Sequence, residues 1–125
     1  MEYLWVGLGG FLGANARYAL GVWIVDRVGA AFPLHTLVIN LSGSLAIGAI
    51  VVLLTERLVA DPAWRLLLVV GFLGGYTTFS SYTIEALELA REGAWPAAAG
   101  YVLASNVLGL AATYLGMVLA RGLSR

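Results

Sequence analysis

The chain contains 125 residues, of which 61% are hydrophobic and only 11% are charged, and its seven basic residues balance seven acidic ones. A soluble domain of this length has too little interior to bury so much apolar surface, and soluble domains carry about 25% charged residues. The composition therefore excludes a soluble domain and predicts an integral membrane protein. Because basic clusters and cysteine are both missing, the sequence also argues against a nucleic-acid partner, disulfides and thiolate chemistry.

Four apolar stretches are long enough to cross a bilayer, whose hydrocarbon core is spanned by about 20 helical residues. The spans are predicted at residues 3–25, 34–54, 64–89 and 95–120. Their connections are short, so consecutive helices should be antiparallel neighbours. The first stretch begins with an acidic residue rather than a basic segment, so we expect a retained span and not a signal peptide. The prediction is one all-α domain over residues 1–125, multi-pass in the inner (plasma) membrane of the cell.

Basic residues divide almost evenly between the two predicted membrane faces. One face holds the chain ends and the second connection, with Arg57, Arg65, Arg121 and Arg125. The other face holds the first and third connections, with Arg27, Arg91 and, depending on its depth, Arg17. Cytoplasmic loops normally carry the basic excess, and here the excess is small. This balance favours insertion in both orientations, with two copies paired antiparallel.

The third predicted span contains a polar segment, GGYTTFSSY, at residues 74–82. About ten residues separate Trp64 from Gly74, a helical rise of roughly 15 Å, which places the segment near the bilayer midplane. Paired glycines tolerate non-helical dihedral angles, and threonine and serine hydroxyls can satisfy backbone groups released from a helix. A helix broken in this way often forms an ion site. The same residues also suit close helix packing, so the segment alone leaves both interpretations open.

Polar residues recur in two other spans. Asn40 and Ser44 lie on one face of the second span. In the last span every fourth residue falls on one stripe, whose members carry hydroxyl groups except for one glycine: Tyr101, Ser105, Gly109 and Thr113. Asn106 lies beside this stripe. Each residue alone suits an interhelical hydrogen bond, but together they predict a polar track. A single four-helix chain has little interior for such a track, so we expect a homodimer to enclose it.

Charged residues within the spans are few. The acidic residues lie near span ends, as Glu85 does in the third span, whereas a proton-coupled pump normally needs a carboxylate inside the membrane. Arg17 lies well within the first span, where it could snorkel or add positive potential to an anion vestibule. His35 is predicted to be interfacial, at the entrance of the second span. Because no nucleophile and base occur at a plausible spacing, we expect no enzyme activity.

Three segments together resemble the Fluc (CrcB) family of fluoride channels: GGFLGANARY in the first span, NLSGS in the second and GFLGGYTTFSSY in the third. The resemblance covers essentially the whole chain. It implies an antiparallel, dual-topology homodimer with two pores and a structural Na⁺ at the dimer centre. The ion would be held by backbone carbonyls at the break in the third helix, which correspond to Gly74 and Thr77.

The resemblance also implies which side chains line the pores. The corresponding positions in this chain are Arg17, Asn40, Phe79, Ser81, Tyr82, Glu85, Tyr101 and Ser105. Two positions depart from the family pattern. Tyr82 stands where the family has a second phenylalanine, and Gly109 stands where a hydroxyl residue is frequent.

We therefore expect a passive fluoride-selective channel that exports fluoride from the cytoplasm. Fluoride holds water tightly, so a pore must replace the water with amide, hydroxyl and ring-edge donors, and full charges would bind the anion too strongly to release it. One alternative is a small four-helix multidrug exporter, which would need a membrane-embedded glutamate where the first span has only Asn15 and Arg17. Another is a non-transporting subunit of a larger membrane complex, whose polar residues would serve packing alone.

Overall fold

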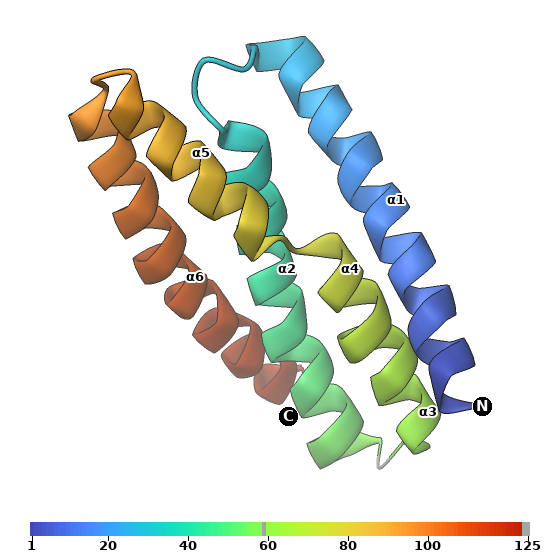
Figure 1. The fold of residues 1–125 in the computed structure, drawn as a ribbon. Helices are drawn as coiled ribbons and strands as arrows, with labels where there is room; N and C mark the ends of the chain where they lie inside the picture. Colours follow the sequence, from blue (N-terminus) through green and yellow to red (C-terminus); the bar gives the residue numbers. More distant parts are fainter. Residues whose placement is uncertain (59, 124–125) are drawn as a thin grey trace.

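The computed structural model describes residues 1–58 and 60–123, and every regular element within them is a helix (Figure 1). In chain order the elements are α1 (Glu2–Val28), α2 (Leu34–Val52), the π-helical η1 (Leu53–Arg57), α3 (Pro62–Arg65), the π-helical η2 (Leu66–Leu73), α4 (Gly74–Tyr76), α5 (Phe79–Arg91) and α6 (Trp95–Gly122). The segment η1 prolongs α2, and α3, η2 and α4 form one continuous helical segment that precedes α5. The predicted all-α class is confirmed.

The helices alternate in direction along the bundle. The N-terminus, the start of α3 and the end of α6 lie at one end, whereas the connections from α1 to α2 and from α5 to α6 lie at the other (Figure 1). Gly29 and Gly93 occupy those two connections with φ values of 84° and 81°, a left-handed conformation that glycine adopts without strain. The arrangement follows the antiparallel order expected from the short connections. Arg125, counted among the charges of the first end, lies outside the described residues.

Three of the four predicted spans meet the length and apolarity that a membrane crossing requires. Among the described residues these are the helical stretches Leu34–Arg57, Pro62–Arg91 and Trp95–Gly122. Helix α1 is long enough, with 27 residues, but its glycines, Asn15 and Arg17 lower its mean hydropathy. The structure thus confirms a helix at the first predicted span, while its crossing of the membrane stays a prediction.

Small residues let the helices approach closely in two places. A Cβ atom at Gly48 of α2 would collide with the Thr113 carbonyl of α6, so these two helices touch backbone to backbone. On the other side of the bundle, a Cβ at Gly75 of α4 would lie 2.7 Å from the Gly10 carbonyl of α1. Side chains at these positions would force the helices apart. Gly10 of α1 thus serves the close packing of α1 against α4.

The third span is interrupted, but two threonines rather than the glycines supply the non-helical backbone. Thr77 (φ −79°, ψ 158°) and Thr78 (φ −147°, ψ 110°) are extended between α4 and α5. Gly74 is helical, with φ −63° and ψ −36°, and Gly75 packs against α1. The prediction that the paired glycines provide the break was therefore wrong in this respect. Both interpretations of the segment hold, with the glycines packing and the threonines breaking the helix.

Candidate functional site

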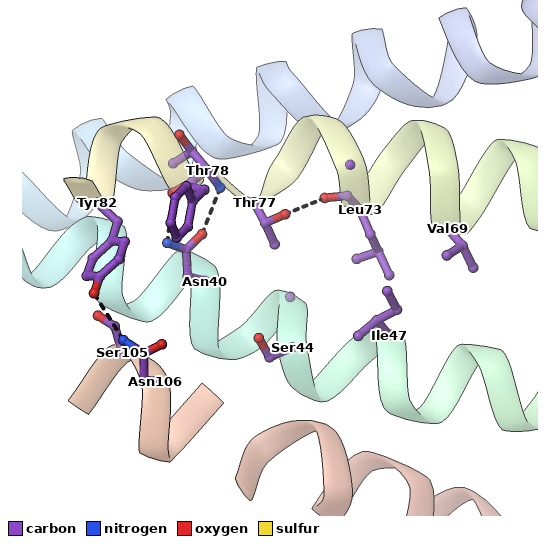
Figure 2. A pocket seen from close by; sticks show the side chains of 13 residues that line it. Asn40, Ser44, Ile47, Val69, Leu73, Thr77, Thr78, Tyr82, Ser105 and Asn106 are labelled. Atoms are coloured by element: carbon purple, nitrogen blue, oxygen red, sulfur yellow. Dashed lines mark hydrogen bonds between the residues drawn. The ribbon is translucent and has the colours of Figure 1, made fainter. Parts of the chain in front are cut away.

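Asn40 of α2 braces the interrupted backbone with both ends of its carboxamide. Its Nδ2 donates to the Thr78 carbonyl at 3.0 Å, and its Oδ1 accepts from the Thr78 N–H at 2.8 Å. Figure 2 shows the side chain reaching from α2 to the extended segment. An extended residue inside a helical bundle has an N–H and a carbonyl without helical partners, and leaving them unpaired is costly. Asn40 satisfies both groups of Thr78, which is 7% exposed.

The break withdraws the usual helical donors from the carbonyls of the last turn before it, among them those of Gly74 and Thr77. In a continuous helix, Thr78 would donate its N–H to the Gly74 carbonyl, but it donates to Asn40 instead. Likewise the Ser81 N–H, which would pair with the Thr77 carbonyl, donates to Thr78 Oγ1 at 3.2 Å. The Thr77 carbonyl instead accepts a hydrogen bond of 3.4 Å from Arg17 Nη1. The carbonyls of Gly74 and Thr77 are the two that the family resemblance implies as ligands of the cation.

A groove of about 350 Å³ lies beside the break, between α2, the third span and α6 (Figure 2). Four of the predicted pore residues line it together with both predicted cation ligands. The lining consists of Asn40, Gly43, Ser44, Ile47, Val69, Leu73, Gly74, Thr77, Thr78, Phe79, Tyr82, Ser105 and Asn106. No charged side chain belongs to this set. Its polar groups are amides, hydroxyls and the main chain of the break.

Two aromatic side chains of α5 stand at this groove. Phe79 is 75% exposed, and its ring centroid lies 5.5 Å from that of Tyr82. Tyr82 in turn meets the ring of Tyr101 edge to face at 5.3 Å. The hydroxyl that distinguishes Tyr82 from phenylalanine accepts a hydrogen bond of 3.0 Å from Asn106 Nδ2, drawn in Figure 2. The tyrosine therefore keeps an aromatic edge at the groove and ties its polar end to α6.

A second cavity of about 520 Å³ lies on the other side of Thr78, between α1, α2 and α5. It contains three more of the predicted residues, namely Arg17, Ser81 and Glu85. Unlike the first groove, this cavity is lined by charged and titratable groups from three helices. Thr78 lines both cavities. The extended segment is therefore the partition between a neutral groove and a charged cavity.

Glu85 is the centre of a hydrogen-bonded cluster in the second cavity. Thr36 Oγ1 donates to its Oε1, and the Tyr101 hydroxyl donates to its Oε2, both at 2.7 Å. His35 Nε2 lies 3.6 Å from the same Oε1 atom. A carboxylate at low exposure needs such donors, since an unpaired charge there would be strongly destabilising. Three helices, α2, α5 and α6, thus meet at one carboxylate.

Tyr101 takes a different place from the one its spacing suggested. Its side chain is completely buried, at 0% exposed, and it belongs to neither cavity lining described above. It packs edge to face against Phe32 at 5.5 Å and donates to Glu85. Ser105, one turn later on α6, does line the groove. Of these two residues with fourfold spacing, Tyr101 is therefore buried and Ser105 faces the groove. A role for Tyr101 in a pore stays a prediction.

Three polar residues of the groove were not among the predicted pore or cation-binding residues. Thr78 was seen only as one of several hydroxyls, although its backbone is the partner of Asn40. Asn106 and Ser44 were noted as polar positions but were not assigned to the site, and both line the groove. The available signal was adjacency, since Asn106 follows Ser105 and Ser44 lies one helical turn after Asn40.

Comparison with known proteins agrees with this geometry. The family model described as "CrcB-like protein, Camphor Resistance (CrcB)" matches residues 4–117. A protein named "Fluoride-specific ion channel FluC" from Solibacter usitatus is 54% identical over 121 residues, covering 97% of this chain and 99% of the relative. Proteins of the same name from Koribacter versatilis and Roseiflexus sp. are 48% and 47% identical, with 98% and 97% of this chain covered and 97% and 98% of each relative. With the family model covering most of its length, this chain belongs to the CrcB family.

Proposed function

We propose that this chain is a fluoride-specific ion channel and not an enzyme, acting as a passive multi-pass protein of the inner (plasma) membrane. The observation that carries the proposal is the uncharged groove at the helix break, whose polar lining is made of amides, hydroxyls and main chain. The relatives that share about half of its residues are named for the same activity. Export follows because a passive pore releases fluoride down its gradient from a cytoplasm in which the ion has accumulated.

The donor set of the groove suits a small, strongly hydrated anion. The hydroxyls of Ser105 and Tyr82 and the edge of the Phe79 ring can each face an anion without a full positive charge, since Tyr82 accepts from Asn106 and keeps its own hydrogen to donate. Conduction requires several weak sites, because one strong site would retain the ion. A groove lined only by neutral groups meets that condition. Behind Thr78, Arg17 adds a positive charge beside the break, in a cavity that also holds the carboxylates of Asp26 and Glu85.

We further propose that the chain works as an antiparallel homodimer with two pores and that α1 is its fourth membrane span. Gly74 and Phe79, both at the break, are exposed, so in a single chain the groove opens onto the surface. The face of α1 also exposes Tyr3, Phe11 and Tyr18. A second copy would cover this apolar surface and close each groove into a pore. The nearly even division of basic residues favours the opposite insertion of the two copies.

A structural Na⁺ is part of the same proposal. The carbonyls of Gly74 and Thr77 have lost their helical donors and are oxygen ligands of the kind that a hard cation prefers. Two copies of the chain would contribute four such oxygens. When bound, the ion would neutralise these carbonyl dipoles and raise the local potential for anions. Arg17, which donates to the Thr77 carbonyl in the single chain, would have to share or release that oxygen.

The polar residues of α1 argue against the alternative of a multidrug exporter. An exporter that exchanges protons for drugs needs a carboxylate inside the membrane. At the middle of α1 the chain instead has Asn15, whose Nδ2 donates to the Phe11 carbonyl of its own helix at 2.7 Å, and Arg17. These groups cannot carry a proton in that role. The other alternative, a packing subunit, would leave the groove without a function.

Fluoride efflux from proteoliposomes tests the proposal directly. Purified protein is reconstituted with internal potassium fluoride, a potassium ionophore is added, and a fluoride-selective electrode records release. We expect rapid release without a proton gradient and no release of chloride under the same conditions. Release of chloride at a comparable rate would refute fluoride specificity. Uptake of a cationic drug that depends on a pH gradient would favour the exporter, and the absence of any flux would favour the subunit.

A further inference from the structure

Two tryptophans and one carboxylate enclose a small cavity at the end of the bundle where α1 and α3 begin. The cavity has a volume of about 280 Å³ and is lined by Trp5, Asp61, Ala63, Trp64 and Leu67. Figure 1 shows the N-terminal end of α1 beside α3 at this position. Trp64 lies in the first turn of a membrane-span candidate. The cavity therefore belongs to the level of the membrane interface, where tryptophans are enriched, and it is far along the bundle from the helix break.

Two indoles and one carboxylate line this mainly apolar cavity, a combination that suits the ammonium group of a lipid headgroup. Asp61 is its only charged lining residue. Its Oδ1 caps α3 by accepting the Ala63 N–H at 2.8 Å, and within the described residues its Oδ2 accepts no hydrogen bond. The two indoles in the lining carry π-faces that can attract a cation in addition. Neither indole N–H has an acceptor among the described residues, and an indole can only donate, so both suit phosphate or ester oxygens.

Another tryptophan of the same chain shows how such an indole is otherwise occupied. Trp23, near the other end of α1, has the guanidinium of Arg27 over its ring at 4.8 Å from the centroid. No intrachain cation covers Trp5 or Trp64 among the residues that the structure describes. Arg65, which follows Trp64 in the chain, is not part of the cavity lining. The cavity at α3 thus combines two indoles with a carboxylate and, among the described residues, with no cation of the chain itself.

We propose that this cavity binds the headgroup of a zwitterionic phospholipid, with the ammonium between the indoles and Asp61. An ethanolammonium group has four heavy atoms and needs roughly 120 Å³ at roughly 30 Å³ per water-sized group, so it fits the volume available. Leu67 and the indoles give the glycerol end an apolar wall. A lipid is the expected source of the ammonium because the cavity lies at the interface and a lipid's chains remain in the bilayer.

Native mass spectrometry of the full-length protein in detergent tests the proposal with matched lipids. Dioleoyl phosphatidylethanolamine and dioleoyl phosphatidic acid share chains and phosphate and differ in the ammonium group, so we expect the first to be retained more strongly. Asp61→Asn keeps the helix cap, since asparagine accepts the same backbone N–H, and removes only the charge. It should weaken retention of phosphatidylethanolamine about three- to tenfold and leave phosphatidic acid unchanged.

Two further variants and one soluble competitor complete the experiment. Trp64→Leu should produce a similar loss, whereas Trp23→Leu, the matched control, should not change the lipid preference. Fluoride efflux of Asp61→Asn should equal that of the parent chain, which shows an intact fold. Equal retention of the two lipids by the parent chain, or an unchanged preference in Asp61→Asn, would overturn the proposal. Retention of phosphoethanolamine, which has no acyl chains, as strong as that of the lipid would overturn the lipid as the source of the ammonium.

Discussion

The brace between Asn40 and the broken helix makes a prediction with two separable parts. Replacing Asn40 by aspartate preserves the size of the side chain and the oxygen that accepts the Thr78 N–H. It removes the Nδ2 donor of the 3.0 Å bond to the Thr78 carbonyl and adds a negative charge to the lining of the groove. The variant should therefore lose both stability and fluoride flux.

The magnitudes follow from the contacts. Leaving the buried Thr78 carbonyl without its donor should cost about 1–3 kcal/mol in the free energy of unfolding. A carboxylate about 5 Å from a permeating anion, at an effective dielectric constant of about 20, repels it by about 3 kcal/mol. At about 1.4 kcal/mol per factor of ten, this repulsion lowers occupancy of the groove roughly 10²-fold. Flux should fall accordingly.

Two variants separate these effects, with efflux measured by the fluoride electrode and stability by denaturant unfolding in micelles. Asn40→Ala removes the brace without adding a charge, so it should be destabilised more than Asn40→Asp, since both bonds to Thr78 are lost. Asn106→Asp adds a charge to the same groove and leaves the Thr78 brace intact. It gives up exposed donations to the Tyr82 hydroxyl and the Val102 carbonyl, but the Tyr82 hydroxyl can donate to the new carboxylate, so flux should fall with less loss of stability than in Asn40→Asp. If Asn40→Asp conducts within twofold of the parent chain, the role of the neutral groove is refuted.

Three further substitutions test the other parts of the structure. Phe79→Ile removes an exposed ring edge and should lower efflux roughly five- to tenfold, equivalent to about 1–1.5 kcal/mol, with no change in oligomeric state by size-exclusion chromatography; unchanged efflux would deny the ring a pore role. Gly48→Ala forces a Cβ against the Thr113 carbonyl and should destabilise the bundle by about 1–3 kcal/mol, and an unchanged unfolding midpoint would contradict the close contact of α2 and α6. Thr36→Val removes one donor of 2.7 Å from Glu85 and should cost about 1–3 kcal/mol; a neutral result would mean that the carboxylate is hydrated instead.

Local properties of the sequence were enough to predict much of this protein. Apolar runs of sufficient length predict helices because a bilayer leaves few other ways to satisfy the backbone, and the observed helices lie where these runs are. The segment GGYTTFSSY was identified as the exceptional part of the third span, and the helix is interrupted inside it. Which of its residues leave the helix could not be predicted, because glycine and threonine both tolerate extended backbone.

The pairing of side chains from different helices was decided by the tertiary structure alone. Asn40 and Thr78 are 38 residues apart, and Thr36 and Glu85 are 49 apart, yet each pair forms hydrogen bonds. Such pairs depend on how the helices rotate and approach, which backbone contacts at small residues determine. The fourfold spacing in the last span could mark Tyr101 and Ser105 as one stripe. Only the packed bundle could bury the first and leave the second at the groove, because side chains of α5 together with Phe32 pack around Tyr101, whereas Ser105 borders the groove.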